Sequence, residues 1–165
     1  MNPEPEWEQR IADLWATSGD HAPEDFLEKM RKLTGELPAG HAVALFELAS
    51  AHDSTSQEAQ AAPLYRQALA AGLTGVRRRR AVIQLASTLR NLDRAEESVA
   101  MLRAERETGS DALDDAVVAF LALALVDTGR EREALALALT ALSRHLPRYN
   151  RSLANYARAL TRGSA

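Results

Sequence analysis

The stretch from Val118 to Leu142, VAFLALALVDTGREREALALALTAL, decides the fold. It contains two segments rich in alanine and leucine, separated once by Thr128-Gly129-Arg130. Because glycine commonly ends a helix and lets the chain reverse, this pattern predicts two helices folded back on each other. Each segment is apolar on more than one face, so a single hairpin would leave apolar surface in water. The stretch therefore predicts neighbouring hairpins of the same kind.

Turn-forming residues divide the rest of the chain into further helical segments. Glycine and proline stand between runs in which apolar residues recur at helical spacing. The sequence predicts a divergent hairpin at 5–36, repeats at 42–72, 77–108 and 112–146, and a capping helix at 150–162. Ser56 is expected to cap the second helix of the first full repeat through its hydroxyl. We interpret residues 1–165 as a single helical-repeat domain, long enough to bury a substantial core.

Small residues recur at one position of each first helix. They are Ala49, Ala86, Ala122 and Ala157, at intervals of 37, 36 and 35 residues. A small side chain lets two paired helices approach closely, while larger neighbours fill the space between consecutive hairpins. One interval before Ala49 stands Ala12, so we assign the first helical segment to the same series.

The order of residues around these alanines resembles the signature of the tetratricopeptide repeat. The first copy reads Leu45…Leu48-Ala49…His52…Ala61…Tyr65…Ala68, and the next two begin Val82…Leu85-Ala86…Leu89 and Val118…Leu121-Ala122…Leu125. The resemblance covers residues 42–162 and, more weakly, 5–36. It implies an all-α fold, a right-handed αα-solenoid of about four helical hairpins plus a C-terminal capping helix. Since His52 takes the place of the usual tyrosine, we expect it to be partly buried.

In tetratricopeptide proteins, the first helices line a concave groove that holds a peptide. By this resemblance the candidate ligand-binding residues are Glu47, Ser50, Arg80, Ile83, Gln84, Ser87, Arg90 and Asn91. Arg80 and Arg90 are expected to attract acidic groups of the ligand. Gln84 and Asn91 are expected to hydrogen-bond its backbone, and Ile83 to give apolar contact. The resemblance thus implies a non-enzymatic scaffold or adaptor for a protein or peptide, which the arginines predict to be acidic.

The third repeat differs because its groove positions are apolar. They are occupied by Phe120, Leu123 and Val126. Since apolar patches of this size are uncommon on a protein surface without a partner, we expect the final helix to cover them through Tyr156 and Leu160. Recognition is accordingly expected in the preceding repeat.

The run Arg77–Arg80 places four cations at the start of a predicted helix, where they oppose the helix dipole. One repeat later, the corresponding positions are Asp114 and Asp115, with another aspartate, Asp111, just before them. Stacked hairpins bring equivalent positions side by side. We therefore predict that the two central arginines pair with these aspartates, which would leave Arg77 or Arg80 for a partner.

Composition excludes several other functions. The chain has no cysteine and only scattered histidines, so we expect no metal site, no cofactor and no catalytic residues. The net charge of −3 gives no field that would attract nucleic acid or an anionic membrane. The first ten residues lack the basic and apolar pattern of a secretion signal, which favours a cytoplasmic location. The excess of arginine over lysine hints at a bacterial source.

A second function stays open beside peptide binding. A helical-repeat module can also serve as a structural, self-associating protein. In that case the groove, or the end of the chain that carries Trp7 and Trp15, would be buried in a homodimer.

Overall fold

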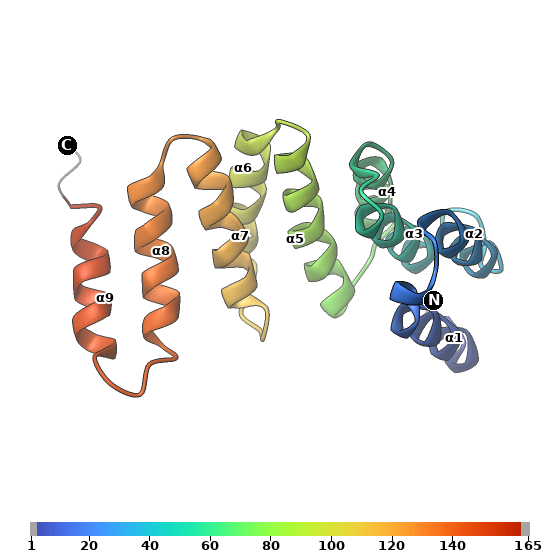
Figure 1. Ribbon diagram of the computed structural model, residues 1–165, viewed down its shortest axis with the longest axis horizontal. Helices are drawn as coiled ribbons and strands as arrows, with labels where there is room; N and C mark the ends of the chain where they lie inside the picture. Colours follow the sequence, from blue (N-terminus) through green and yellow to red (C-terminus); the bar gives the residue numbers. More distant parts are fainter. Residues whose placement is uncertain (1–2, 163–165) are drawn as a thin grey trace. The chain divides into compact units, whose positions relative to one another are not determined.

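Apolar residues at helical spacing form nine α-helices in the computed structural model, which describes residues 3–162 (Figure 1). The helices are α1 (Pro5–Ala16), α2 (Pro23–Thr34), α3 (Ala42–Ser54), α4 (Glu58–Ala70), α5 (Gly75–Asn91), α6 (Ala95–Arg106), α7 (Asp114–Asp127), α8 (Glu131–Ser143) and α9 (Asn150–Ala159). A short 3-10 turn, η1 (Ser18–Asp20), follows α1, and residues 3–162 contain no strand. The predicted all-α repeat fold is confirmed.

Packing divides the chain into two compact units, Met1–Thr88 (unit 1) and Leu89–Ala165 (unit 2). The boundary falls within α5, whose first part belongs to unit 1. The interpretation of residues 1–165 as a single domain stays a prediction. The termini at residues 1–2 and 163–165 lie outside the described part of the chain.

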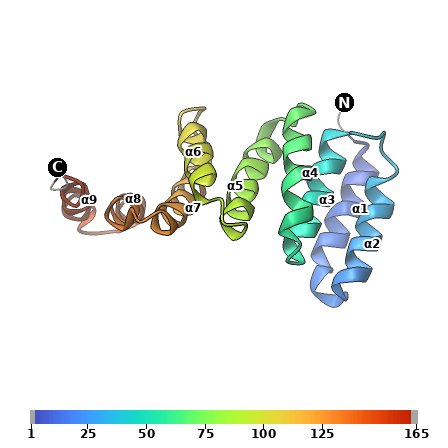
Figure 2. The same cartoon turned by 90° about the horizontal axis from the view of Figure 1, so that it is seen from above.

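In unit 1, consecutive helices pack on one another from α1 to α4 (Figure 2). Aromatic rings fill the space between them. The Trp15 ring lies 5.1 Å from that of Phe26, and Phe46 lies 6.3 Å from Tyr65, measured between ring centroids. Ala49 is fully buried, as expected of a small residue that lets α3 and α4 approach closely.

In unit 2, α6 packs on α7, α7 on α8, and α8 on α9. The core is carried chiefly by α7, which buries Val117, Leu121 and Leu125 completely. α9 contributes one fully buried residue, Ala157. Apolar burial is therefore shallowest at α9.

Three hairpin turns share one backbone geometry. Ser56, Asp93 and Gly129 stand at the equivalent position of the three turns, with φ of 57°, 59° and 73°. In each turn the next residue donates its N–H to a carbonyl five residues back, at 2.9, 2.9 and 2.8 Å. This bond ends the preceding helix as in a Schellman motif. The prediction that Ser56 caps α4 is wrong, because Ser56 is the left-handed turn residue and Gln57 holds the cap position without a side-chain cap.

Candidate functional site

A polar network joins the first helices of unit 1. Arg77 at the start of α5 donates to Glu8 of α1 at 2.9 and 2.5 Å, and to Glu47 of α3 at 3.1 Å. The other Glu47 carboxylate oxygen accepts the indole N–H of Trp15 at 2.9 Å. Burial lowers the pKa of Arg77, but the bonds and charges of Glu8 and Glu47 outweigh it, so the pKa is raised overall. Of the two arginines of which one was expected to be left for a partner, Arg77 is therefore engaged within unit 1.

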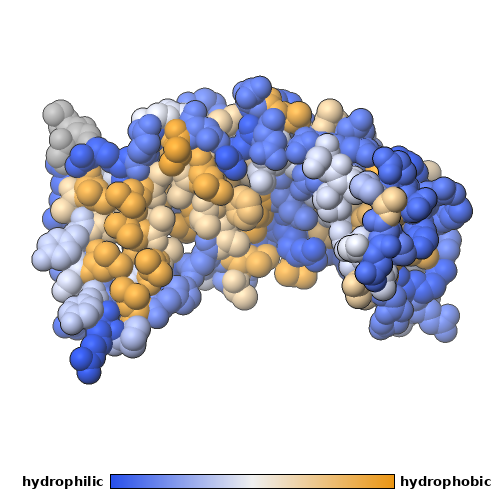
Figure 3. Space-filling model, in the orientation of Figure 1, coloured by the Kyte–Doolittle hydropathy of each residue, from blue (hydrophilic) through white to orange (hydrophobic). Residues whose placement is uncertain are grey.

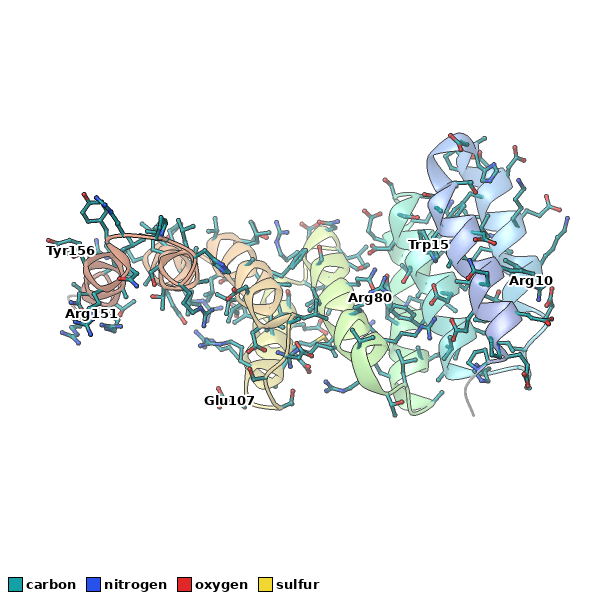
Figure 4. All side chains as sticks on the ribbon, turned by 90° about the horizontal axis from the view of Figure 1, so that it is seen from below. Arg10, Trp15, Arg80, Glu107, Arg151 and Tyr156 are labelled. Atoms are coloured by element: carbon teal, nitrogen blue, oxygen red, sulfur yellow. The ribbon has the colours of Figure 1, made fainter. Side chains whose placement is uncertain are left out.

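Arg80 lies one turn further along α5 and is exposed. Its guanidinium carbon stands 5.3 Å from the centroid of the Phe46 ring, in cation–π geometry. Phe46 itself is completely buried, so the ring is a fixed support for the cation. Figure 4 labels Arg80 on α5 beside the helices of unit 1. The arrangement holds a positive charge at the surface with little freedom to move.

Gln84 and Ser87 follow Arg80 on the same face of α5, because residues four and seven positions apart share a helical stripe. Both are partly exposed. The side-chain oxygen of Gln84 is buried and has no hydrogen-bond partner in the described structure. A buried acceptor without a donor costs about 1–3 kcal/mol. We call Arg80, Gln84 and Ser87 the α5 stripe.

Three other predicted site residues lie in the interior instead of on a groove wall. Glu47, Ser50 and Ile83 are 4%, 3% and 6% exposed. Glu47 holds Trp15 and Arg77, as described above, and the Ser50 hydroxyl accepts the phenol O–H of Tyr65 at 3.3 Å. These side chains take part in packing and in internal hydrogen bonds.

The last two predicted site residues belong to unit 2. Arg90 is partly exposed and forms an ion pair with Asp127 at the end of α7. Asn91 is exposed at the end of α5. The Arg90 guanidinium is thus committed to a carboxylate of its own chain.

A buried polar cluster on α3 escaped the sequence analysis. The Asp53 carboxylate accepts the Thr88 hydroxyl at 2.9 Å and the Tyr65 phenol at 3.4 Å. Burial raises the pKa of Asp53, although the Thr88 bond acts against it. The neighbouring His52 is 6% exposed and bonds Gln57 at 2.8 Å, which confirms its structural role. An aspartate in the last turn of a predicted helix gives no sequence signal of burial.

In unit 2, the apolar groove positions are not covered as expected. Leu123 and Val126 are 47% and 48% exposed, and Phe120 is partly exposed. Tyr156, which was expected to shield them, is itself 73% exposed, while Leu160 is half-buried. Figure 3 shows apolar side chains gathered on this surface over α7, α8 and α9. The expectation that Tyr156 covers the face is wrong, because this side chain lies in solvent.

The aspartates at the start of α7 also have partners within unit 2. Asp115 pairs with Arg144 and with Nε2 of His145, the latter at 2.8 Å. The His145 bond lowers the pKa of Asp115, and Arg144 adds to this effect. Asp114 accepts the hydroxyl of Ser110. Pairing of the central arginines of α5 with these aspartates stays a prediction.

Neither Trp7 nor Trp15 forms an exposed end of unit 1. Trp7 is 4% exposed and donates its indole N–H to the Leu33 carbonyl at 2.8 Å. Trp15 is half-buried against Phe26 and Glu47. The tryptophans thus fix α1 onto its neighbours, and a homodimer at that end stays a prediction.

Residues 3–162 contain no group of three or more histidine or acidic side chains arranged to hold a metal ion. Nor does this part of the chain include a helix with the length and apolar character that crossing a bilayer requires.

Comparison with known proteins gives one match. A family model described as tetratrico peptide repeat matches residues 42–160, which is most of the chain and includes α3 to α9. Searches of curated proteins and of solved structures gave no match. The matched range coincides with the helices whose turns and small residues repeat in phase, and the chain belongs to the tetratricopeptide repeat family.

Proposed function

We propose that this protein is a non-enzymatic adaptor that binds an acidic peptide or protein segment through the α5 stripe. Repeats of this family generally mediate interactions between proteins and are typically not catalytic. The observation that carries the proposal is Arg80, an exposed cation held on the buried ring of Phe46. The other arginine of the predicted groove, Arg90, is neutralised by Asp127, so Arg80 supplies the charge.

Each residue of the stripe has one task in this proposal. The guanidinium of Arg80 binds a ligand carboxylate through two parallel N–H bonds. Because the Phe46 ring already limits its motion, Arg80 loses little conformational entropy on binding. The partly exposed Gln84 side chain rotates outward so that its oxygen, which is buried and has no partner in the described structure, accepts a backbone N–H of the ligand. Ser87 adds a hydroxyl on the same side of the helix.

Composition suggests the cellular compartment and the type of source organism. The absence of cysteine suits a reducing compartment, and the preference for arginine over lysine is typical of a GC-rich genome. We propose a bacterial cytoplasmic adaptor on these grounds.

A peptide-array experiment tests the binding proposal. Arrays of acidic, neutral and basic peptides are probed with the wild-type chain and with Arg80→Glu. We expect acidic peptides to bind the wild type and to lose about tenfold or more in affinity with the variant, since a charge-assisted pair becomes a repulsion. Wild-type binding should also weaken as salt is added.

The matched control is Arg31→Glu, which makes the same charge change on the exposed side of α2. Equal loss of binding in both variants would show that net charge, and not Arg80, is responsible. Peptides that bind regardless of their charge would contradict the proposal outright. Circular dichroism of each variant shows that the helices remain folded.

A further inference from the structure

The large apolar side chains that unit 2 exposes lie on three consecutive helices. They are Leu123 and Val126 of α7, Leu135 and Leu142 of α8, Tyr149 directly before α9, and Tyr156 within α9. Their exposed fractions run from 47% to 76%. Apolar surface is gathered over the same helices in Figure 3. We call this surface the unit 2 apolar face.

The face follows from the way α8 packs. Ala134 and Ala136 of α8 are buried, whereas Leu135, Ala138 and Leu142 are exposed. The three exposed residues are spaced three and four positions apart, so they form one stripe along the helix. On α9, Tyr156 and Arg151 point to opposite sides (Figure 4). The charge of Arg151 is thus kept away from the side that carries Tyr156.

Tyr149 adds a second, independent observation. It precedes α9 with φ of 67°, in the left-handed region that bulky residues rarely adopt, and its side chain is 76% exposed. This conformation is disfavoured for a residue with a β-carbon. Such strain is concentrated at binding surfaces, where a contact compensates for it. A large aromatic residue is thus held in solvent beside an apolar surface at a cost in stability.

The size of the face suits a second copy of the chain. At these exposed fractions, the six side chains present several hundred square ångströms, which is on the order of the ~800 Å² that each partner buries in a standard interface. Exposed tyrosines also match the composition of interface centres, which are enriched in aromatic residues. A patch of this size is uncommon on a monomer without a partner.

Charges at the two ends of α8 are complementary to each other. Glu131 is exposed one turn before Leu135 on the same stripe. At the other end, Arg144 pairs with Asp115 but keeps 57% of its side chain exposed, so its guanidinium is open to a second carboxylate. Two α8 helices that lie antiparallel would place Glu131 of each copy against the basic end of the other. A parallel arrangement would bring like ends together.

We infer that two copies of this chain form a twofold-symmetric dimer through the unit 2 apolar face, with their α8 helices antiparallel. A twofold axis makes every contact occur twice, so the leucine stripe and both charged ends are used in each copy. The interface lies on a different surface from the α5 stripe and does not depend on peptide binding.

Sedimentation velocity over a concentration series tests the dimer. The wild-type chain should change from 18.0 kDa to twice that mass as concentration rises. Leu142→Glu should weaken the dimer at least tenfold, because it places a charge in the centre of the apolar contact. Val76→Glu is the matched control, since Val76 is an exposed apolar residue of unit 1 at 62%. Helical content of both variants is checked by circular dichroism.

Charge exchange tests the antiparallel arrangement. Glu131→Lys alone and Arg144→Glu alone should each weaken the homodimer, because both put like charges at two symmetric contacts. A mixture of the two variants should restore association, since each contact then joins opposite charges. Restoration should be lost at high salt.

Three results would overturn the inference. A chain that stays monomeric at every concentration excludes it, even if the same face then binds a model amphipathic helix of leucine and lysine. A dimer that Leu142→Glu leaves intact but Val76→Glu disrupts uses another surface. A dimer whose strength is indifferent to the mixed charge variants does not have antiparallel α8 helices.

Discussion

At the scale of single residues, the polar side chains inside unit 1 are the least typical feature of the chain. Asp53 is partly buried and accepts two hydroxyl donors, Thr88 and Tyr65, and it forms no ion pair within residues 3–162. Removing a carboxylate from water is unfavourable unless its charge is compensated. The pKa of Asp53 is raised for this reason, with burial as the main cause.

The raised pKa makes the contribution of Asp53 to stability depend on pH. The folded protein holds the Asp53 proton to higher pH than the unfolded chain, whose aspartates ionise at about pH 4. The contribution is therefore fully present below pH 4 and is lost as pH rises through the raised pKa. We expect the stability of the wild type relative to Asp53→Asn to fall over this range, as measured by urea unfolding. A relative stability that rises with pH would contradict this, and Asp25→Asn on the exposed side of α2 is the control.

At the scale of elements, three helical hairpins, α3–α4, α5–α6 and α7–α8, each depend on one residue with positive φ. Gly129 adopts this conformation without strain, whereas Ser56 and Asp93 adopt it at a cost. The three turns thus have the same shape but unequal local stability. Their hydrogen bonds, which run from the following residue to a carbonyl of the preceding helix, are nearly identical.

Exchanging turn residues should change stability in opposite directions. Ser56→Gly is expected to stabilise the protein by about 0.5–1 kcal/mol, because glycine removes strain at φ of 57°. Gly129→Ala is expected to destabilise it by about 1–2 kcal/mol, although no atom crowds the added methyl group. Urea unfolding of both variants gives the two values. A stabilising Gly129→Ala would mean that backbone conformation does not limit the turn.

At the scale of the whole molecule, the helices are not equally anchored. α3 buries residues on nearly all of its faces, including Phe46 and Ala49, whereas α9 buries only Ala157 fully. Local opening costs least where few apolar contacts are lost. The amides of α9 should therefore exchange with solvent hydrogen faster than those of α3, by about tenfold or more, in native-state exchange at low protein concentration. Equal protection of the amides of α3 and α9 would contradict the expectation that α9 is the less firmly packed helix.

The sequence predicts the repeat because helical spacing and small residues act locally. Positions such as Ala49 and Ala122 must be small whatever the remaining sequence, so their recurrence was visible in the chain. Burial of Glu47 was not predictable, because it depends on Trp15 and Arg77, which lie 32 and 30 residues away. Exposure of Tyr156 was missed for a related reason. An apolar stripe indicates that a helix has a packing face but not how much of it the neighbours cover.

The hydrogen bond between Trp15 and Glu47 has a practical consequence for the intrinsic fluorescence of this protein. Both tryptophans of the chain, Trp7 and Trp15, lie in α1, and residues 89–165 contain none. Indole emission therefore arises from unit 1 alone. The Trp15 indole and Arg77, which lies three residues before Arg80, both donate to the Glu47 carboxylate. We therefore expect the wavelength and intensity of Trp15 fluorescence to respond to a change of charge near Glu47. The molecule thus carries an intrinsic optical probe in unit 1, the unit that also contains the α5 stripe.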